Sequence, residues 1–263
     1  METISLELAE TTKQRLVAGC ETLHGLLSGL IRSQGSIAVK VHQIRKLGKS
    51  LRGGFSLFCL GDSSAREVQA IGRMLSGSRD AVSRLNTWQR LEWASDPISC
   101  RAIGVLLDRQ VEMVACKPPV ETLNWCLIRV SRAQSMLEDL ESAALPHRIA
   151  KGLKKLGKRV RKKCRHLDDA QEEAFHDARK GLKAYLGALD YLPPERWTPD
   201  PEMAALAELL GDENDLATLS IWLRDHGFTH ILEPDLWDCL KISRTKVQRK
   251  AVRDAAQIAL PNE

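Results

Sequence analysis

The chain has 263 residues, 43% hydrophobic and 28% charged, a composition typical of a globular protein with a sizeable core. Lys and Arg (39) exceed Asp and Glu (34) by only five charges, so any anion-binding function requires the basic residues to be concentrated in one place. The absence of an 18-residue apolar run, and of an apolar stretch after the acidic start Met1–Thr3, predicts no membrane span and no secretion signal. Seven cysteines without a C-x-x-C pair are expected to be reduced and mostly buried, which favours a cytoplasmic protein.

Apolar residues at helical spacing recur along the chain. They lie three and four residues apart over 41–58, and the same spacing returns over 149–167, 175–189 and 242–260. The prolines, which interrupt helices, lie at 97, 118–119, 146, 193–201, 234 and 261, mostly between these segments. Aromatic residues make up only 5% of the chain, and we find no strand-like alternation. The sequence therefore predicts an all-α protein.

Two segments share one sequence pattern. Residues 41–49 and 175–183 both read apolar-His-x-apolar-Arg-Lys-x-x-Lys, and each is followed by an acidic segment, at 77–82 and 211–216. The two histidines, His42 and His176, are 134 positions apart, and the matching aspartates, Asp80 and Asp215, are 135 apart. This agreement predicts an internal repeat, with residues 1–143 forming a first helical bundle and residues 147–263 a second. We expect the acidic segments at helix starts, where carboxylates cap the helix and offset its dipole.

Basic residues gather on helical faces. One set follows the first apolar stripe at spacings of three, four and three: His42, Arg45, Lys49 and Arg52. The second repeat carries a shorter set: His176, Arg179 and Lys183. Residues 148–165 contain ten Lys or Arg and no acidic residue, and the last predicted helix carries a further basic face. Because like charges on one face destabilise a helix, this pattern favours a bound polyanion over its alternatives, packed histidines and solvated charged faces.

Motifs for catalysis are incomplete. The nearest approach to a phosphate-binding loop, Gly72 to Gly77, lacks the lysine and hydroxyl that follow in a true P-loop. His226 and His230 are four residues apart, but Gly227 weakens the helix that a metal pair would need, so we predict neither a metal site nor a cofactor. Acidic clusters at 168–173 and 212–215 leave one enzymatic alternative, a Mg²⁺-dependent polyphosphate or triphosphate hydrolase. A nucleic-acid-binding protein that uses the basic faces is the other alternative.

The segments 41–58, 175–189 and 210–216, in this order, resemble the CHAD domain, the conserved histidine α-helical domain. The resemblance runs through nearly the whole chain, and we assign residues 1–263 to one such domain. It implies two pseudo-symmetric four-helix bundles that meet along a central basic channel. It further implies a non-catalytic targeting or accessory module that binds inorganic polyphosphate, accompanies a polyphosphate-metabolising enzyme and associates with polyphosphate granules.

The resemblance and the basic last helix together indicate a polyphosphate site. The expected residues are His42, Arg45, Lys49, Arg52, Arg79, Lys154, Lys155, Lys158, Arg159, Arg161, Lys162, His176, Arg179, Lys183, Arg249 and Arg253. Three positions depart from the family pattern: Leu186 stands where an Arg is expected, Asn214 stands where the first repeat has Arg79, and Gly157 stands where an aromatic residue is common. Because polyphosphate carries no bases, such a site needs no aromatic stacking platform, and its affinity is expected to depend strongly on salt.

Overall fold

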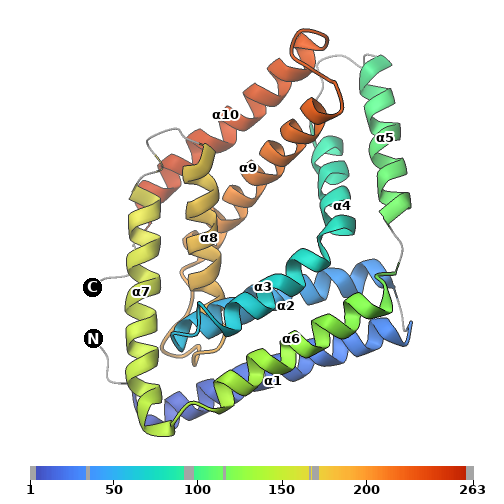
Figure 1. The fold of residues 1–263 in the computed structure, drawn as a ribbon. Coiled ribbons are helices and arrows are strands. Elements are labelled where there is room, and N and C mark those ends of the chain that lie inside the picture. Colours follow the sequence, from blue (N-terminus) through green and yellow to red (C-terminus); the bar gives the residue numbers. More distant parts are fainter. Residues whose placement is uncertain are drawn as a thin grey trace.

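The computed structural model describes residues 4–33, 36–91, 98–114, 117–165, 167 and 172–258. Its regular elements in these ranges are all helices, which confirms the all-α prediction (Figure 1). The ten α-helices are α1 (Leu6–Ile31), α2 (Ile37–Leu57), α3 (Ser64–Met74), α4 (Ser76–Gln89), α5 (Ile98–Val114), α6 (Val120–Glu138), α7 (Leu145–Arg165), α8 (Glu172–Leu189), α9 (Pro201–Asp225) and α10 (Pro234–Gln257), and a short 3-10 helix, η1 (Ser142–Ala144), precedes α7. Within the described ranges, no helix is both long and apolar enough to span a membrane.

Helix starts follow local sequence signals, with one correction. Pro201 and Pro234 begin α9 and α10, where a missing backbone N–H costs no hydrogen bond, and the Asp200 side chain accepts a hydrogen bond from the backbone N–H of Glu202 at 2.8 Å. The acidic segment 211–216, expected at a helix start, instead lies in the middle of α9. Its central residue, Glu213, is buried because it anchors α10, as described below.

Three apolar clusters form the core. The first is built by α1, α2, α3 and α6 with the first half of α7 and the end of α8, and the second by α7, α8, α9 and the end of α10. The third joins α4 and α5 to the C-terminal part of α9 and the start of α10. The first and third clusters thus cross the expected boundary near residue 145. The internal repeat and its two bundles stay a prediction.

α2 and α8 cross each other closely. A Cβ atom on Gly53 of α2 would lie 2.5 Å from the Ala184 carbonyl oxygen and the Ala188 nitrogen of α8, so only glycine fits there. A Cβ atom on Gly187 of α8 would lie 3.0 Å from the Cα of Ser50, and the Ser50 hydroxyl donates a hydrogen bond of 2.7 Å to Asp190. The crossing brings the two helices that carry the repeated His-x-x-Arg-x-x-x-Lys pattern directly against each other.

The cysteines are packing groups. All six that the structure describes are free thiols, and four of them are buried. Burial raises the pKa of both Cys126 and Cys164 to about 11, so these thiols are protonated and unreactive at neutral pH.

Candidate anion-binding site

A hollow of about 580 Å³ lies between α2, α3, α7 and α8, and we call it the basic hollow. Its described lining includes one carboxylate, that of Asp62, and eight basic side chains. The basic side chains are Lys49, Arg52, Arg66, Lys155, Arg159, Arg179, Lys180 and Lys183. Six of the eight are among the residues that the sequence analysis singled out.

Helical spacing and the α2–α8 crossing bring these cations together. Lys155 and Arg159 lie one turn apart on α7, and Arg179 and Lys183 lie one turn apart on α8, so each pair faces one side. On α7 the adjacent side is apolar and buried against the core, through Ile149, Leu156 and Val160. Amphipathic helices whose apolar sides pack into the core therefore turn their basic sides toward a shared space.

The cations in the basic hollow repel one another. Burial lowers the pKa of Arg52, and the positive charges of Arg159 and Arg73 lower it further. Carboxylates partly neutralise Arg66, which lies 3.0 Å from Asp62, and Lys180, which lies 3.8 Å from Asp177. An anion placed beside Arg52 would relieve the remaining repulsion, because opposite charges favour the ionised form.

A second, smaller hollow of about 230 Å³ continues along α2 between α2 and α3. It shares Lys49 and Arg52 with the basic hollow and adds Arg45 and Arg73. Arg45 is held in place there, because its Nη1 donates a hydrogen bond of 2.6 Å to the Gly72 carbonyl and its Nη2 lies 3.5 Å from the Asp80 carboxylate. Its charge is thus shared with an acidic neighbour.

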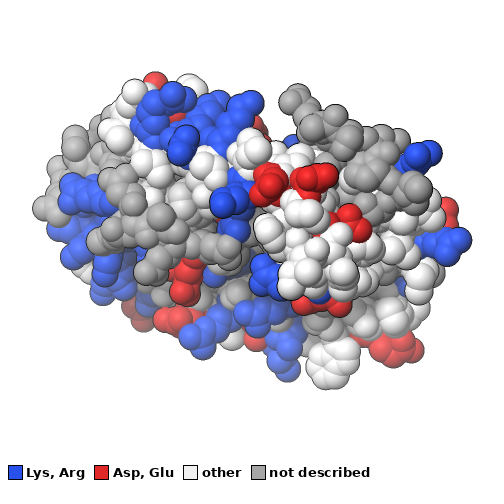
Figure 2. Space-filling view, turned by 90° about the horizontal axis from the view of Figure 1, so that it is seen from above, with Lys and Arg blue, Asp and Glu red and all other residues white. Residues whose placement is uncertain are grey.

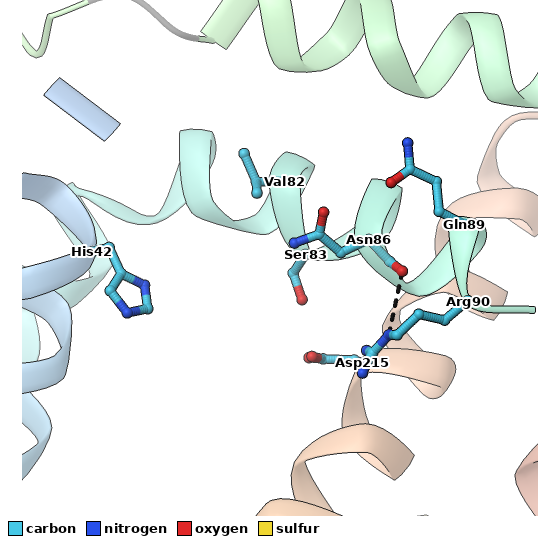
Figure 3. A pocket seen from close by; sticks show the side chains of 7 residues that line it. All are labelled: His42, Val82, Ser83, Asn86, Gln89, Arg90 and Asp215. Atoms are coloured by element: carbon cyan, nitrogen blue, oxygen red, sulfur yellow. Dashed lines mark hydrogen bonds between the residues drawn. The ribbon is translucent and has the colours of Figure 1, made fainter. Parts of the chain in front are cut away.

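His42 faces a different hollow of about 460 Å³, between α2, α4 and α9 (Figure 3). The other lining residues are Val82, Ser83, Asn86, Gln89, Arg90 and Asp215. His42 extends toward this space from α2, and Asp215 borders it from α9. The basic member, Arg90, lies 3.1 Å from the Asp212 carboxylate, so this hollow, which we call the His42 hollow, carries little net positive charge.

Comparison with known proteins identifies the family. The model of the CHAD domain matches residues 31–224, a range that contains both repeated segments. The chain belongs to the CHAD domain family. The crystal structure of the CHAD domain from the plant Ricinus communis is similar, with a TM-score of 0.68 and 18% identity over 97% of this chain and 93% of that one. PptA from Streptomyces chartreusis is similar at a TM-score of 0.58 and 14% identity, over 95% and 99% of the two chains. No curated protein matches in sequence.

At these identities the two structures support the CHAD fold alone. His176 does not line the basic hollow of this CHAD domain. Its Nδ1 atom lies 2.8 Å from the Asn214 side-chain oxygen, a hydrogen bond that ties α8 to α9. Asn214, which departs from the family pattern, thus has a packing role here.

Other expected site residues lie outside the basic hollow. On α7, Lys154, Lys158 and Lys162 are exposed, Arg161 is half-buried, and none of the four belongs to the described lining. Arg249 and Arg253 lie on an exposed basic face of α10 with Lys241, Lys246 and Lys250. Figure 2 looks down on the side of the molecule that α10 crosses in Figure 1, and shows Lys and Arg gathered at the upper left, apart from an acidic group near the middle. The side chain of Arg79 is outside the described residues.

Sequence reasoning missed three basic residues near Arg52. Arg66 and Lys180 line the basic hollow, and Arg73 lines the smaller one. A signal was present, because Arg66 and Arg73 are seven positions apart and therefore share one face of α3. Lys180 directly follows Arg179 in the repeated segment. Consecutive residues of a helix point in different directions, so the three- and four-residue spacing placed Lys180 outside the face of His176, Arg179 and Lys183.

Glu213 of the second acidic cluster and His226 have structural partners, whereas most of the acidic cluster at 168–173 lies outside the described residues. Buried Glu213 accepts hydrogen bonds from Arg244 at 2.8 Å and Gln248 at 3.0 Å, which fastens α9 to α10. His226 stacks on Trp222 and lies within hydrogen-bond distance of the Trp222 carbonyl. Among the described residues, no group of three or more His, Cys, Asp or Glu side chains is arranged to hold a metal ion.

Proposed function

We propose that this CHAD domain binds inorganic polyphosphate in the basic hollow. The observation that carries the proposal is the concentration of eight basic side chains from four helices around one space whose described lining contains a single carboxylate. The chain as a whole has a net charge of only +5, so this grouping is a local feature rather than a general one. The lowered pKa of Arg52 supports a site that is electrostatically incomplete without an anion.

The lining chemistry suits a phosphate chain better than a nucleic acid. Arginine offers a planar fork of donors to phosphate oxygens, and lysine adds mobile point charges. Neutralising several phosphates at once releases counterions, so the affinity should fall steeply as salt rises. The described lining contains no aromatic side chain on which a base could stack.

The arrangement supports binding rather than hydrolysis. Asp62, the lining carboxylate, is strongly exposed and forms an ion pair with Arg66 at 3.0 Å, so it is not set up to hold Mg²⁺ against a phosphate. We therefore propose a targeting or accessory module that presents polyphosphate to a polyphosphate-metabolising enzyme. Mg²⁺-dependent phosphate release by the purified protein would instead indicate the hydrolase.

The test uses two pairs of charges on one helix. Lys155→Gln/Arg159→Gln removes two cations that line the basic hollow, and Lys154→Gln/Lys158→Gln removes two exposed cations of α7 that do not. With end-labelled long-chain polyphosphate at two salt concentrations, we expect the first variant to lose about tenfold or more in affinity and to show a shallower salt dependence. The second variant should stay within about twofold of the wild type.

Equal losses in the two variants would contradict a site in the basic hollow. A competition arm separates the ligand classes, because single-stranded RNA should displace polyphosphate poorly at equal phosphate concentration. If RNA displaces it equally well, the basic hollow is a nucleic-acid site and the polyphosphate proposal fails.

A further inference from the structure

α6 has an exposed apolar face on the side away from the core. It packs against α1 and α3 through buried residues that include Leu123, Cys126 and Val130, and Figure 1 shows it along an edge of the molecule. On its outer face, the side chain of Trp125 is 54% exposed and that of Ile128 is 43% exposed. Exposed large apolar groups that cluster on one face typically mark an interaction surface.

The outer face of α6 has a spacing that suits a second helix. Glu121, Trp125, Ile128 and Arg132 are four, three and four residues apart, the spacing at which one side of a helix forms a packing seam. The spacing of these four residues is the same in both chain directions, so it also matches that of a copy of α6 that runs antiparallel. An antiparallel copy of α6 turned about an axis between residues 126 and 127 would therefore place Trp125 opposite Ile128 of the second copy.

The charges of this face are also self-complementary. The same two-fold axis places Glu121 opposite Arg132 of the second copy, so two opposite-charge pairs form, one at each end of the apolar centre. A polyanion would meet Glu121 and two apolar side chains here, and a basic partner would meet Arg132. A second copy of this chain satisfies all four positions at once, with tryptophan, a residue enriched at interface centres, in the middle.

We propose that the chain forms a homodimer through antiparallel pairing of α6 with α6 of a second copy. Trp125 and Ile128 form the centre of the interface, and Glu121 and Arg132 form its reciprocal ion pairs. None of these residues lines the basic hollow, so the dimer does not depend on the polyphosphate proposal.

Sedimentation velocity of the full chain, over concentrations from about 1 to 200 µM, tests the pairing. We expect a concentration-dependent dimer in the wild type, and a dissociation constant raised about tenfold or more by Trp125→Ser or by Ile128→Glu. Ile231→Glu is the matched control, because Ile231 is 90% exposed in the turn between α9 and α10, far along the chain from α6. This control should leave the dimer unchanged.

Charge reversal tests the antiparallel register. Glu121→Arg alone and Arg132→Glu alone should weaken the dimer, and the double variant should restore it because the reciprocal pairs are rebuilt with opposite sign. Circular dichroism checks that each variant is folded, since Glu121 lies in the first turn of α6. A wild type that stays monomeric over the whole range, a dimer that survives Ile128→Glu, or a double variant that is not restored would each overturn the proposal.

Discussion

The basic hollow and the His42 hollow share α2 but differ in charge. Along one side of this helix, His42, Arg45, Lys49 and Arg52 form a continuous stripe in the sequence. Lys49 and Arg52 are joined by cations from α3, α7 and α8, whereas His42 shares its hollow with Asp215 of α9 and with uncharged polar side chains of α4 (Figure 3). Arg45 lies at the boundary, where Asp80 shares its charge.

This difference shows that a stripe on one helix does not define a site. The character of each hollow is determined by the helices that pack around α2, and these are brought there by the α2–α8 crossing and by the contact of α4 with α9. Three kinds of variant can therefore change the difference in charge between the two hollows: variants that disturb the helix packing, variants that remove a lining cation and variants that remove a carboxylate.

The largest effect is expected at the α2–α8 crossing. In Gly53→Ala the new Cβ would meet main-chain atoms of α8 at 2.5 Å, and a backbone cannot yield as a flexible side chain can. We expect a loss of about 3 kcal/mol in the free energy of unfolding, measured by urea denaturation. Gly25→Ala in α1 is the control, because its Cβ would meet nothing within 4 Å. It should stabilise the protein by up to about 1 kcal/mol, and a similar loss in both variants would contradict a tight crossing.

The second-largest effect is expected on polyphosphate affinity, and it differs between substitutions in the basic hollow and in the His42 hollow. Arg52→Gln removes a half-buried cation that lines both the basic hollow and the smaller one beside it. We expect about a tenfold loss of affinity, which corresponds to about 1.4 kcal/mol. His42→Gln removes a side chain of the His42 hollow only and should change the affinity by less than about twofold. Titration of labelled long-chain polyphosphate measures both, and a larger loss for His42→Gln would reverse the assignment of the site.

A gain of affinity is expected when the His42 hollow is made basic. Asp215→Lys replaces the carboxylate that faces His42 with a cation, so the positive stripe on α2 would continue past Arg45. We expect about a threefold rise in affinity for long chains, because one repulsive charge becomes attractive at a partly exposed position. Short chains that fill only the basic hollow should gain less. An equal gain for tripolyphosphate would mean that the His42 hollow is not the next part of the path.

Much of the fold was predictable because the helices are strongly amphipathic. The apolar spacing of 149–167 and 175–189 places α7 and α8 within a few residues of their ends. The acidic segment of α9 was placed wrongly, because a Gly followed by carboxylates is typical of a helix start and a buried partner such as Arg244 leaves no local signal. Side-chain pairing across helices cannot be seen in a single sequence pattern.

The sequence predicted which residue types form the candidate site, but it predicted only some of the individual residues that line it. Helical periodicity identified Lys49, Arg52 and Lys183, but it could not separate Lys155 from Lys154 without knowing which side of α7 faces α2 and α8. The contribution of α3 was missed because its two arginines are interrupted by apolar residues that pack into the core. Which of these cations line the basic hollow depends on how distant helices pack together, and local spacing in the sequence does not encode that packing.

The smallest effect concerns Asp177, whose carboxylate pairs with Lys180 of the basic hollow. A hydrogen bond from Lys163 at 2.6 Å lowers the pKa of Asp177, against the opposing effect of burial, and Lys180 adds to the lowering. A carboxyl whose pKa is lower in the folded state stabilises the protein above its usual pKa, and that contribution is lost as the pH falls through the lowered value. Asp177→Asn should therefore cost a few tenths to about 1 kcal/mol at pH 7 and almost nothing near pH 2.

The same substitution should raise polyphosphate affinity, because Lys180 would no longer share its charge with Asp177. We expect about a twofold gain at pH 7, within the range of a single partly exposed ion pair. Urea denaturation at several pH values measures the change in the free energy of unfolding. Asp225→Asn, at the exposed end of α9, is the control. A variant that loses stability equally at pH 7 and pH 2 would show that Asp177 acts by packing. A variant that loses stability at pH 7 as expected but gains no affinity would place Lys180 outside the path of the polyphosphate chain.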